Sequence, residues 1–142
     1  MAGYMRKLGS YVYNGEYKAA QAMANGTFVD IQPQGVKPIA ADGDAVLRVA
    51  EKTTLFGKKA LVLDVVTAGT KETYFLENEA ELPDGASFDT AEHICKAGDY
   101  CRMHRLIPGE QLIMSVADEV YTAHELNALV KPATGGSVKA NA

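Results

Sequence analysis

The most strongly patterned part of the chain lies near its middle, at residues 45–66. Two runs rich in Val and Leu are separated there by the polar, glycine-containing stretch LFGKK. Within these runs the apolar residues alternate with Arg48, Glu51 and Asp64, which is the pattern of a strand that buries one face. The segment predicts a central β-hairpin around which a small β-rich domain is organised.

Shorter segments on both sides also predict strands. They are residues 27–31, 72–76, 102–107 and 111–116. The last two flank Pro108-Gly109-Glu110 and are expected to form a strand–turn–strand unit. Residues 32–43 contain two prolines and two glycines, so we expect a long loop there.

Two other segments are compatible with either a helix or a strand. Residues 19–24 fit a single helical turn or a strand that leads into an Asn25-Gly26 turn, and we favour the strand. Residues 90–97 follow a capping-box pattern that favours a helix. The alternative is a strand at residues 91–96 in a hairpin with residues 100–107, which the β-like flanking sequence slightly favours.

The best-defined helix is predicted near the C-terminus, at residues 123–130. Thr122 can cap it, and Glu125, three residues later, can reach back to the cap. Tyr121 and Leu126 stand where a hydrophobic staple would form, and Pro132 prevents the helix from continuing. The small-residue sequence at 134–142 is expected to be a flexible tail or a second arm.

The N-terminal residues are rich in tyrosine and contain a strong turn signal. Asn14-Gly15 stands between Tyr-rich segments and predicts a hairpin. Residues 1–10 are expected to be an arm that is either frayed or docked on a neighbour. Tyrosine is enriched in interfaces, so we regard Tyr4, Met5, Arg6, Tyr11, Tyr13 and Tyr17 as candidate interface residues. The alternative is that the tyrosines cover the domain's own core.

Together these elements predict a mainly β fold: a small β-sandwich or barrel-like domain with one short C-terminal helix and extended terminal arms. We expect an N-terminal aromatic arm or hairpin at residues 1–18, a β-rich body at 19–131 and a C-terminal tail at 132–142. The chain has 142 residues, which matches a single domain.

Charge narrows the range of functions. The net charge is −4, so a general nucleic-acid-binding surface is not expected. Seven acidic residues and no Lys or Arg lie within residues 72–92. This segment either orients a partner or forms a solvated acidic face, the usual reading of a charge run. No apolar run is long enough for a secretory leader or a membrane span, so we expect synthesis in a cytoplasm.

Both cysteines and two of the three histidines fall within twelve residues: His93, Cys95, Cys101 and His104. Zinc prefers four such ligands, but the spacing lacks a tight Cys-x2-Cys pair. In a regular hairpin His104 would point to the opposite face from Cys101. Two buried thiols without a metal or a disulfide are therefore the expected state, as cysteines in a cytoplasm normally are reduced.

No catalytic or cofactor-binding residue is expected. A cysteine–histidine pair can be written down, but no local signature supports a nucleophile and its base. Glu77, Glu79 and Glu81 alternate on one side of an extended chain and could gather a cation. They lack the glycine-punctuated loop of a calcium site, so a solvated face is the expected reading.

Three short sequence segments resemble those of a known protein family. Residues 25–31 (NGTFVDI), 46–49 (VLRV) and 108–116 (PGEQLIMSV) resemble small structural proteins of tailed bacteriophages, the head decoration or cement proteins. The resemblance implies a non-enzymatic virion protein on the capsid exterior that stabilises the expanded head. It also implies the major capsid protein and further copies of itself as partners, with a trimer at capsomer junctions, and neither nucleic acid nor membrane.

The alternative is a non-catalytic β-domain that binds a ligand or another protein outside any virion. Such a domain could hold zinc at His93, Cys95 and Cys101, with a fourth ligand from elsewhere.

Overall fold

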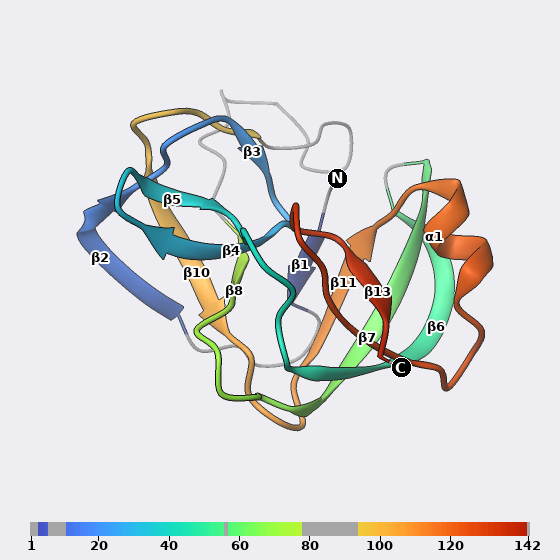
Figure 1. The fold of residues 1–142 in the computed structure, drawn as a ribbon. Coiled ribbons are helices and arrows are strands. Elements are labelled where there is room, and N and C mark those ends of the chain that lie inside the picture. Colours follow the sequence, from blue (N-terminus) through green and yellow to red (C-terminus); the bar gives the residue numbers. More distant parts are fainter. Residues whose placement is uncertain (1–2, 6–10, 56, 78–93, 142) are drawn as a thin grey trace.

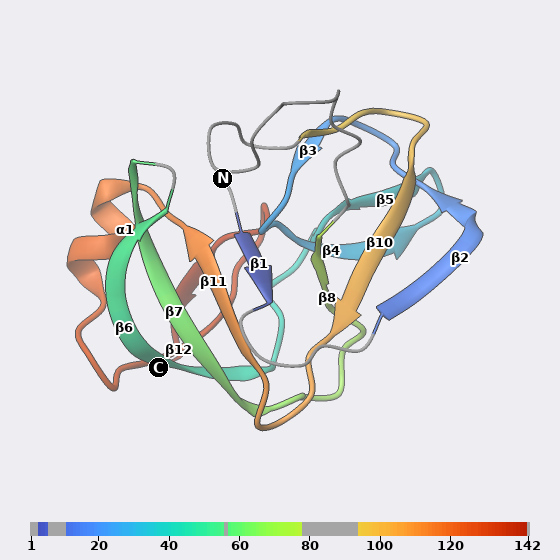
Figure 2. The ribbon, with the colours of Figure 1, turned by 180° about the vertical axis from the view of Figure 1, so that it is seen from behind.

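Two antiparallel sheets form the body of the molecule in the computed structural model, which describes residues 3–5, 11–55, 57–77 and 94–141. The six-stranded sheet has the order β1-β11-β7-β6-β12-β13 and the five-stranded sheet the order β2-β10-β8-β4-β5. β3 and β9 form a separate pair. Figures 1 and 2 show the two sheets from opposite sides, with the helix α1 beside the β6–β7 hairpin. The predicted mainly β fold with one short helix is confirmed.

The bounds of the elements are as follows. The six-stranded sheet contains β1 (Gly3–Met5), β11 (Gln111–Ser115), β7 (Lys58–Thr67), β6 (Val46–Leu55), β12 (Leu129–Pro132) and β13 (Val138–Ala140). The five-stranded sheet contains β2 (Tyr11–Lys18), β10 (Tyr100–Arg105), β8 (Tyr74–Leu76), β4 (Phe28–Gln32) and β5 (Gly35–Pro38). The remaining elements are β3 (Met23–Ala24), β9 (Ile94–Cys95) and α1 (Asp118–Ala123).

The central hairpin is present as predicted, formed by β6 and β7. Leu47 and Val49 on β6 are buried and Arg48 between them is exposed, because successive side chains point to opposite faces of a strand. On β7 the residues from Ala60 to Leu63 are all buried. That strand lies inside the sheet and contributes to an apolar cluster on each of its faces.

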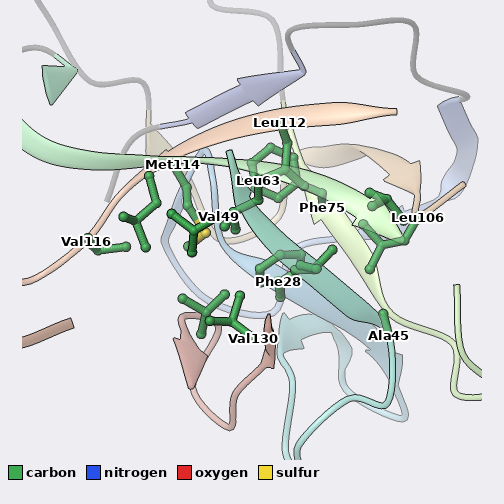
Figure 3. Close-up of a cluster of buried hydrophobic side chains, with 14 of the residues drawn as sticks. Phe28, Ala45, Val49, Leu63, Phe75, Leu106, Leu112, Met114, Val116 and Val130 are labelled. Carbon is green, nitrogen blue, oxygen red and sulfur yellow. The ribbon is translucent and has the colours of Figure 1, made fainter. Parts of the chain in front are cut away.

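The main core lies between the two sheets (Figure 3). Phe28 and Phe75 from the five-stranded sheet meet Leu63 and Leu112 from the six-stranded sheet. The two phenylalanine rings are tilted against each other with their centroids 5.4 Å apart, a favourable aromatic geometry. Each fully buried side chain of this size stabilises the fold by about 1.5–3 kcal/mol relative to exposure.

The five-stranded sheet curls towards closure and encloses a second core. Ala19, the first residue after β2, forms a parallel bridge with Val36 on the opposite edge strand, β5. The enclosed cluster contains Met103, Leu76 and both cysteines. The barrel-like character expected from the sequence therefore belongs to this half of the molecule.

The predicted C-terminal helix is wrong in position. The helix is Asp118–Ala123, and Leu129–Pro132, which overlaps the predicted helix, is strand β12. Ala117 takes the cap position, with no side-chain hydrogen bond from it. The apolar burial of Val130, which pairs with Leu47 of β6, outweighs the local helix signals.

The predicted C-terminal tail is also wrong, since Val138–Ala140 pairs with β12 and forms an edge of the six-stranded sheet. Asp42 holds this segment in place. Its carboxylate accepts hydrogen bonds from the Thr134 amide at 2.9 Å and from Lys139 at 2.8 Å. These partners lie more than ninety positions away in sequence, so no local pattern could reveal them.

Two further turn and loop predictions are wrong, because strand pairing between distant residues overrides the local turn signals. Asn14-Gly15 does not make a hairpin but lies inside β2. There Tyr13 pairs with Arg102 and Lys18 with Tyr100, so the surplus residues on β2 are accommodated as an irregularity in the ladder. The expected long loop at residues 32–43 contains strand β5, which pairs with β4.

The remaining strand predictions are confirmed with changed partners or bounds. Residues 23–26 form a strand followed by a turn, and β4 and β8 lie within their predicted segments to within one residue. β10 and β11 are both present but belong to different sheets, so the turn between them carries the chain across the core. Ile94–Cys95 is a strand, as favoured, but its ladder partner is β3; residues 91–93 lie outside the described residues.

Candidate functional site at the N-terminal strand

β1 pairs with β11 and lies on the side of that strand towards the five-stranded sheet (Figure 2). Gly3 pairs with Met114, Tyr4 with Ile113 and Met5 with Leu112. A Cβ atom at Gly3 would lie 2.6 Å from the Ile113 carbonyl oxygen and 2.7 Å from the Gly26 Cα atom. Only glycine fits at that position while β1 is paired with β11. The backbone around Gly3 therefore requires this residue type.

A carboxylate joins β1 to the other sheet. The Met5 amide donates a hydrogen bond of 2.9 Å to one oxygen of Glu77, the residue directly after β8. The other oxygen lies 2.8 Å from Nε2 of His104 on β10. A hydrogen bond from an amide to a charged carboxylate is worth about 1.5–3 kcal/mol, more than a neutral one. Glu77 therefore connects the N-terminal strand to the five-stranded sheet.

His104 is only 2% exposed, and Glu110 lies within its electrostatic reach. Burial raises the pKa of Glu110 above its ordinary value, and the attraction of His104 partly opposes the shift. One carboxylate oxygen of Glu110 is buried and accepts no hydrogen bond from the described residues. The imidazole therefore has almost no contact with solvent, and through Glu77 it is linked to the amide of β1.

The candidate interface residues fall into three groups. Tyr4 is 40% exposed on the edge strand β1, whereas the side chain of Met5 packs against the main core. Tyr17 is partly buried against the second core. Tyr11 and Tyr13 lie on β2, an end strand of its sheet, and Arg6 lies outside the described residues. The structure thus places Tyr4 at an accessible edge and draws Met5 and Tyr17 towards the protein's own cores.

The cysteines meet the expectation of two buried thiols without a disulfide. Their Sγ atoms are 3.9 Å apart. The hydrogen bond with Cys95, together with burial, raises the pKa of the Cys101 thiol well above its ordinary value. His104 contacts Glu77 rather than the thiols, and strand alternation had predicted only that it lies on the face of β10 opposite Cys101. Within the described residues no group of three or more His, Cys, Asp or Glu could hold a metal ion, and His93 lies outside them.

Sequence reasoning missed the roles of Glu77 and Glu110. Glu77 was grouped with Glu79 and Glu81 on a solvated face, and the latter two lie outside the described residues. No local signal marks these roles, because β10 carries two arginines as well as His104. Only the burial of the imidazole, which the structure shows, calls for a polar partner. Which carboxylate would supply it could not be read from the sequence, because Glu77 is 27 positions from His104.

Comparison with known proteins adds no family. No family model matches the chain, and neither the curated proteins nor the solved structures compared with it give a match. Across the part of the chain that the structure describes, no helix has the length and apolar character needed to cross a membrane.

Proposed function

We propose that this chain is a structural virion protein that binds the outer surface of a tailed-phage capsid and stabilises the expanded head. It acts as a small oligomer, a trimer at capsomer junctions, with the major capsid protein and further copies of itself as partners. Its role is mechanical, without catalysis and without nucleic acid or membrane as a ligand. The proposal rests on the resemblance of three sequence segments and on the position of the chain ends.

The observation that carries it is that both terminal strands form the edges of one sheet. β13 has β12 as its ladder neighbour, so one of its sides has no ladder partner among the described residues. Such a backbone edge can pair with a strand of another protein, which is the mode of attachment called β-augmentation. β1 is the other end of the sheet, but its Met5 amide already donates to Glu77, and its exposed feature is the side chain of Tyr4. The β13 edge and the exposed Tyr4 side chain lie on the two end strands of one sheet, so one copy can contact two neighbours on a shell.

Weak pairing at each edge is sufficient on a repeated lattice. A three-residue strand offers few hydrogen bonds, each worth about 1 kcal/mol. Contacts repeated around a ring of copies act together, because the second contact forms at a high effective concentration once the first is made. The net charge of −4 also suits the outside of a shell better than a surface that faces packaged DNA.

The first test is copy number. Virions from a phage that encodes this chain are purified, and the chain is quantified against the major capsid protein by mass spectrometry. We expect one copy per capsid subunit or a simple lattice fraction. A handful of copies per particle would indicate a neck or tail component and refute the capsid assignment, and absence from the particle would refute the virion role.

A second test separates edge attachment from attachment in general. Tyr4→Glu places a charge on edge strand β1, and Leu126→Glu places the same charge on an exposed loop residue that belongs to no strand. Co-sedimentation with shells that lack the protein should fall for Tyr4→Glu and stay unchanged for Leu126→Glu. Equal behaviour of the two variants would contradict attachment through β1.

The alternative, a ligand- or protein-binding β-domain with zinc at His93, Cys95 and Cys101, is favoured by one observation. The two thiols already lie side by side, at an Sγ–Sγ distance of 3.9 Å. Metal analysis of the purified protein tests it directly: one zinc per chain, lost in Cys95→Ala, would support the alternative over the capsid role.

A further inference from the structure

Two buried thiols are in contact within the second core, which the curled five-stranded sheet encloses. Cys95 ends the short strand β9 and Cys101 lies on β10, and each side chain is fully buried. Their Sγ atoms are 3.9 Å apart, with one thiol acting as hydrogen-bond donor to the other. The sulfur atoms need to approach by only about 2 Å to reach the length of a disulfide bond.

The turn between the cysteines is held at several points, which keeps the thiols together. Within the turn the Lys96 amide donates to the Asp99 carboxylate at 3.0 Å, and Gly98 adopts a left-handed conformation with φ of 90°. Ala19 anchors the turn to the end of β2 through two backbone hydrogen bonds of 2.8 Å, with Gly98 and Asp99. The folded chain therefore presents one thiol to the other at a high effective concentration.

Access to the pair requires only a small movement. Residues 96–100 are exposed, and β9 is a strand of two residues whose ladder partner is the equally short β3. Short elements with exposed neighbours open at a lower free-energy cost than the centre of a sheet. While the site is closed, the contact with Cys95 and burial raise the pKa of the Cys101 thiol, which keeps this thiol protonated and unreactive.

We propose that Cys95 and Cys101 are a modification site, a dithiol that closes to an intramolecular disulfide when the protein leaves a reducing compartment. The oxidant is a low-molecular-weight disulfide, such as glutathione disulfide. This inference goes beyond the proposed capsid function and does not depend on it.

The chemistry balances through two exchange steps. One cysteine thiolate attacks the small disulfide, forms a mixed disulfide with one half and releases the other half as a thiolate. The second cysteine thiolate then attacks the protein sulfur of the mixed disulfide, and the remaining half leaves. Two protein thiols are oxidised, one small disulfide is reduced to two thiols, and the two protons lost by the cysteines end on those thiols.

The test uses the whole protein. It is purified with a reductant, transferred into a glutathione redox buffer at pH 8, quenched in acid and analysed by intact mass after alkylation in denaturant. We expect the oxidised protein to take up no alkylating agent. Its mass should be about 2 Da below that of the reduced, unalkylated protein, because two hydrogens are removed. A tryptic map should show residues 95 and 101 joined within one chain.

Equilibrium constants in a native buffer and in a denaturant distinguish preorganisation from mere proximity in sequence. We expect the dithiol to form the disulfide at least about tenfold more favourably in the native protein than in the unfolded chain. The oxidised protein should also melt several degrees higher, because the closed loop restricts the unfolded state.

Cys95→Ala and Cys101→Ala are the matched controls, since alanine replaces a buried thiol without adding a polar group. Each should form only a mixed disulfide, in which the glutathione mass remains attached. The wild-type measurement needs no variant to fold. A dithiol that stays fully alkylatable at oxidising potentials, a stable mixed disulfide in the wild type, or a native equilibrium constant equal to the unfolded one would each overturn the proposal.

Discussion

Replacing Gly3 by alanine should release β1 from its pairing with β11 without unfolding the rest of the domain. The added Cβ would lie 2.6 Å from the Ile113 carbonyl oxygen and 2.7 Å from the Gly26 Cα atom. Both obstacles are backbone atoms in the interior of the structure, so neither can move aside at low cost. β1 pairs with β11 alone among the described strands, so it is the part that can move.

The loss of stability is limited by what docking contributes. The hydrogen bond from Met5 to Glu77 stabilises the docked strand by about 1.5–3 kcal/mol, partial burial of Met5 by about 1, and pairing with β11 by about 2–3. Ordering three residues costs about 3–6 kcal/mol. The net docking free energy is therefore about 4 kcal/mol or less, and Gly3→Ala can destabilise the protein by no more than that.

Hydrogen exchange read by mass spectrometry measures the release directly. In Gly3→Ala, peptides that cover residues 3–5 and 111–115 should exchange faster, and peptides from β6 should keep their protection. Gly57→Ala is the control, because it changes the same residue types at a position with φ of 76° and no atom within 4 Å of the added Cβ. It should lower stability by about 1 kcal/mol through backbone strain and leave β11 protected. Unchanged exchange of β11 in Gly3→Ala would refute the close packing of Gly3 beside β11.

Three further predictions follow from individual side chains. Because burial raises the pKa of Glu110, the folded state binds a proton more tightly than the unfolded state, and stability falls as the pH rises from the ordinary pKa through the raised one. Glu110→Gln should therefore be more stable than the wild type in urea titrations at neutral pH, and this advantage should vanish in acid below the ordinary pKa of glutamate. The pKa of Asp42 is lowered by its bonds to Lys139 and Thr134, so its contribution is present above the ordinary pKa and is lost as the pH falls through the lowered one. Asp42→Asn should increase hydrogen exchange in β13 at neutral pH and have little effect in strong acid; equal exchange at neutral pH would contradict the role of this carboxylate. Phe28→Ala removes a fully buried ring that packs on the main core and should cost about 3–5 kcal/mol in denaturant unfolding, and a loss below 1 kcal/mol would show that this core is not packed as described.

The central hairpin and the segments at residues 27–31, 72–76, 102–107 and 111–116 were predictable because alternation of apolar and polar residues is a local signal. The two cysteines were correctly expected to be buried thiols. The contact of Glu77 with both β1 and His104 was not predictable, because the three groups are far apart in sequence and Glu77 is one of seven acidic residues within residues 72–92. The interface role of Tyr4 stays a prediction.

By itself, the sequence of this protein determined its mainly β character, its central hairpin and the segments at residues 27–31, 72–76, 102–107 and 111–116, since each depends on neighbours within a few positions. Tertiary structure decided where the local signals failed. Leu129–Pro132 became a strand because Val130 gains burial beside Leu47, although the capping signals at Thr122 and Glu125 predict a helix through residue 130. The chain ends became edge strands because Glu77 and Asp42 bind them from 72 and more than ninety positions away. Pairing over such separations is chosen by the free energy of the whole packed arrangement, which no short stretch of sequence contains.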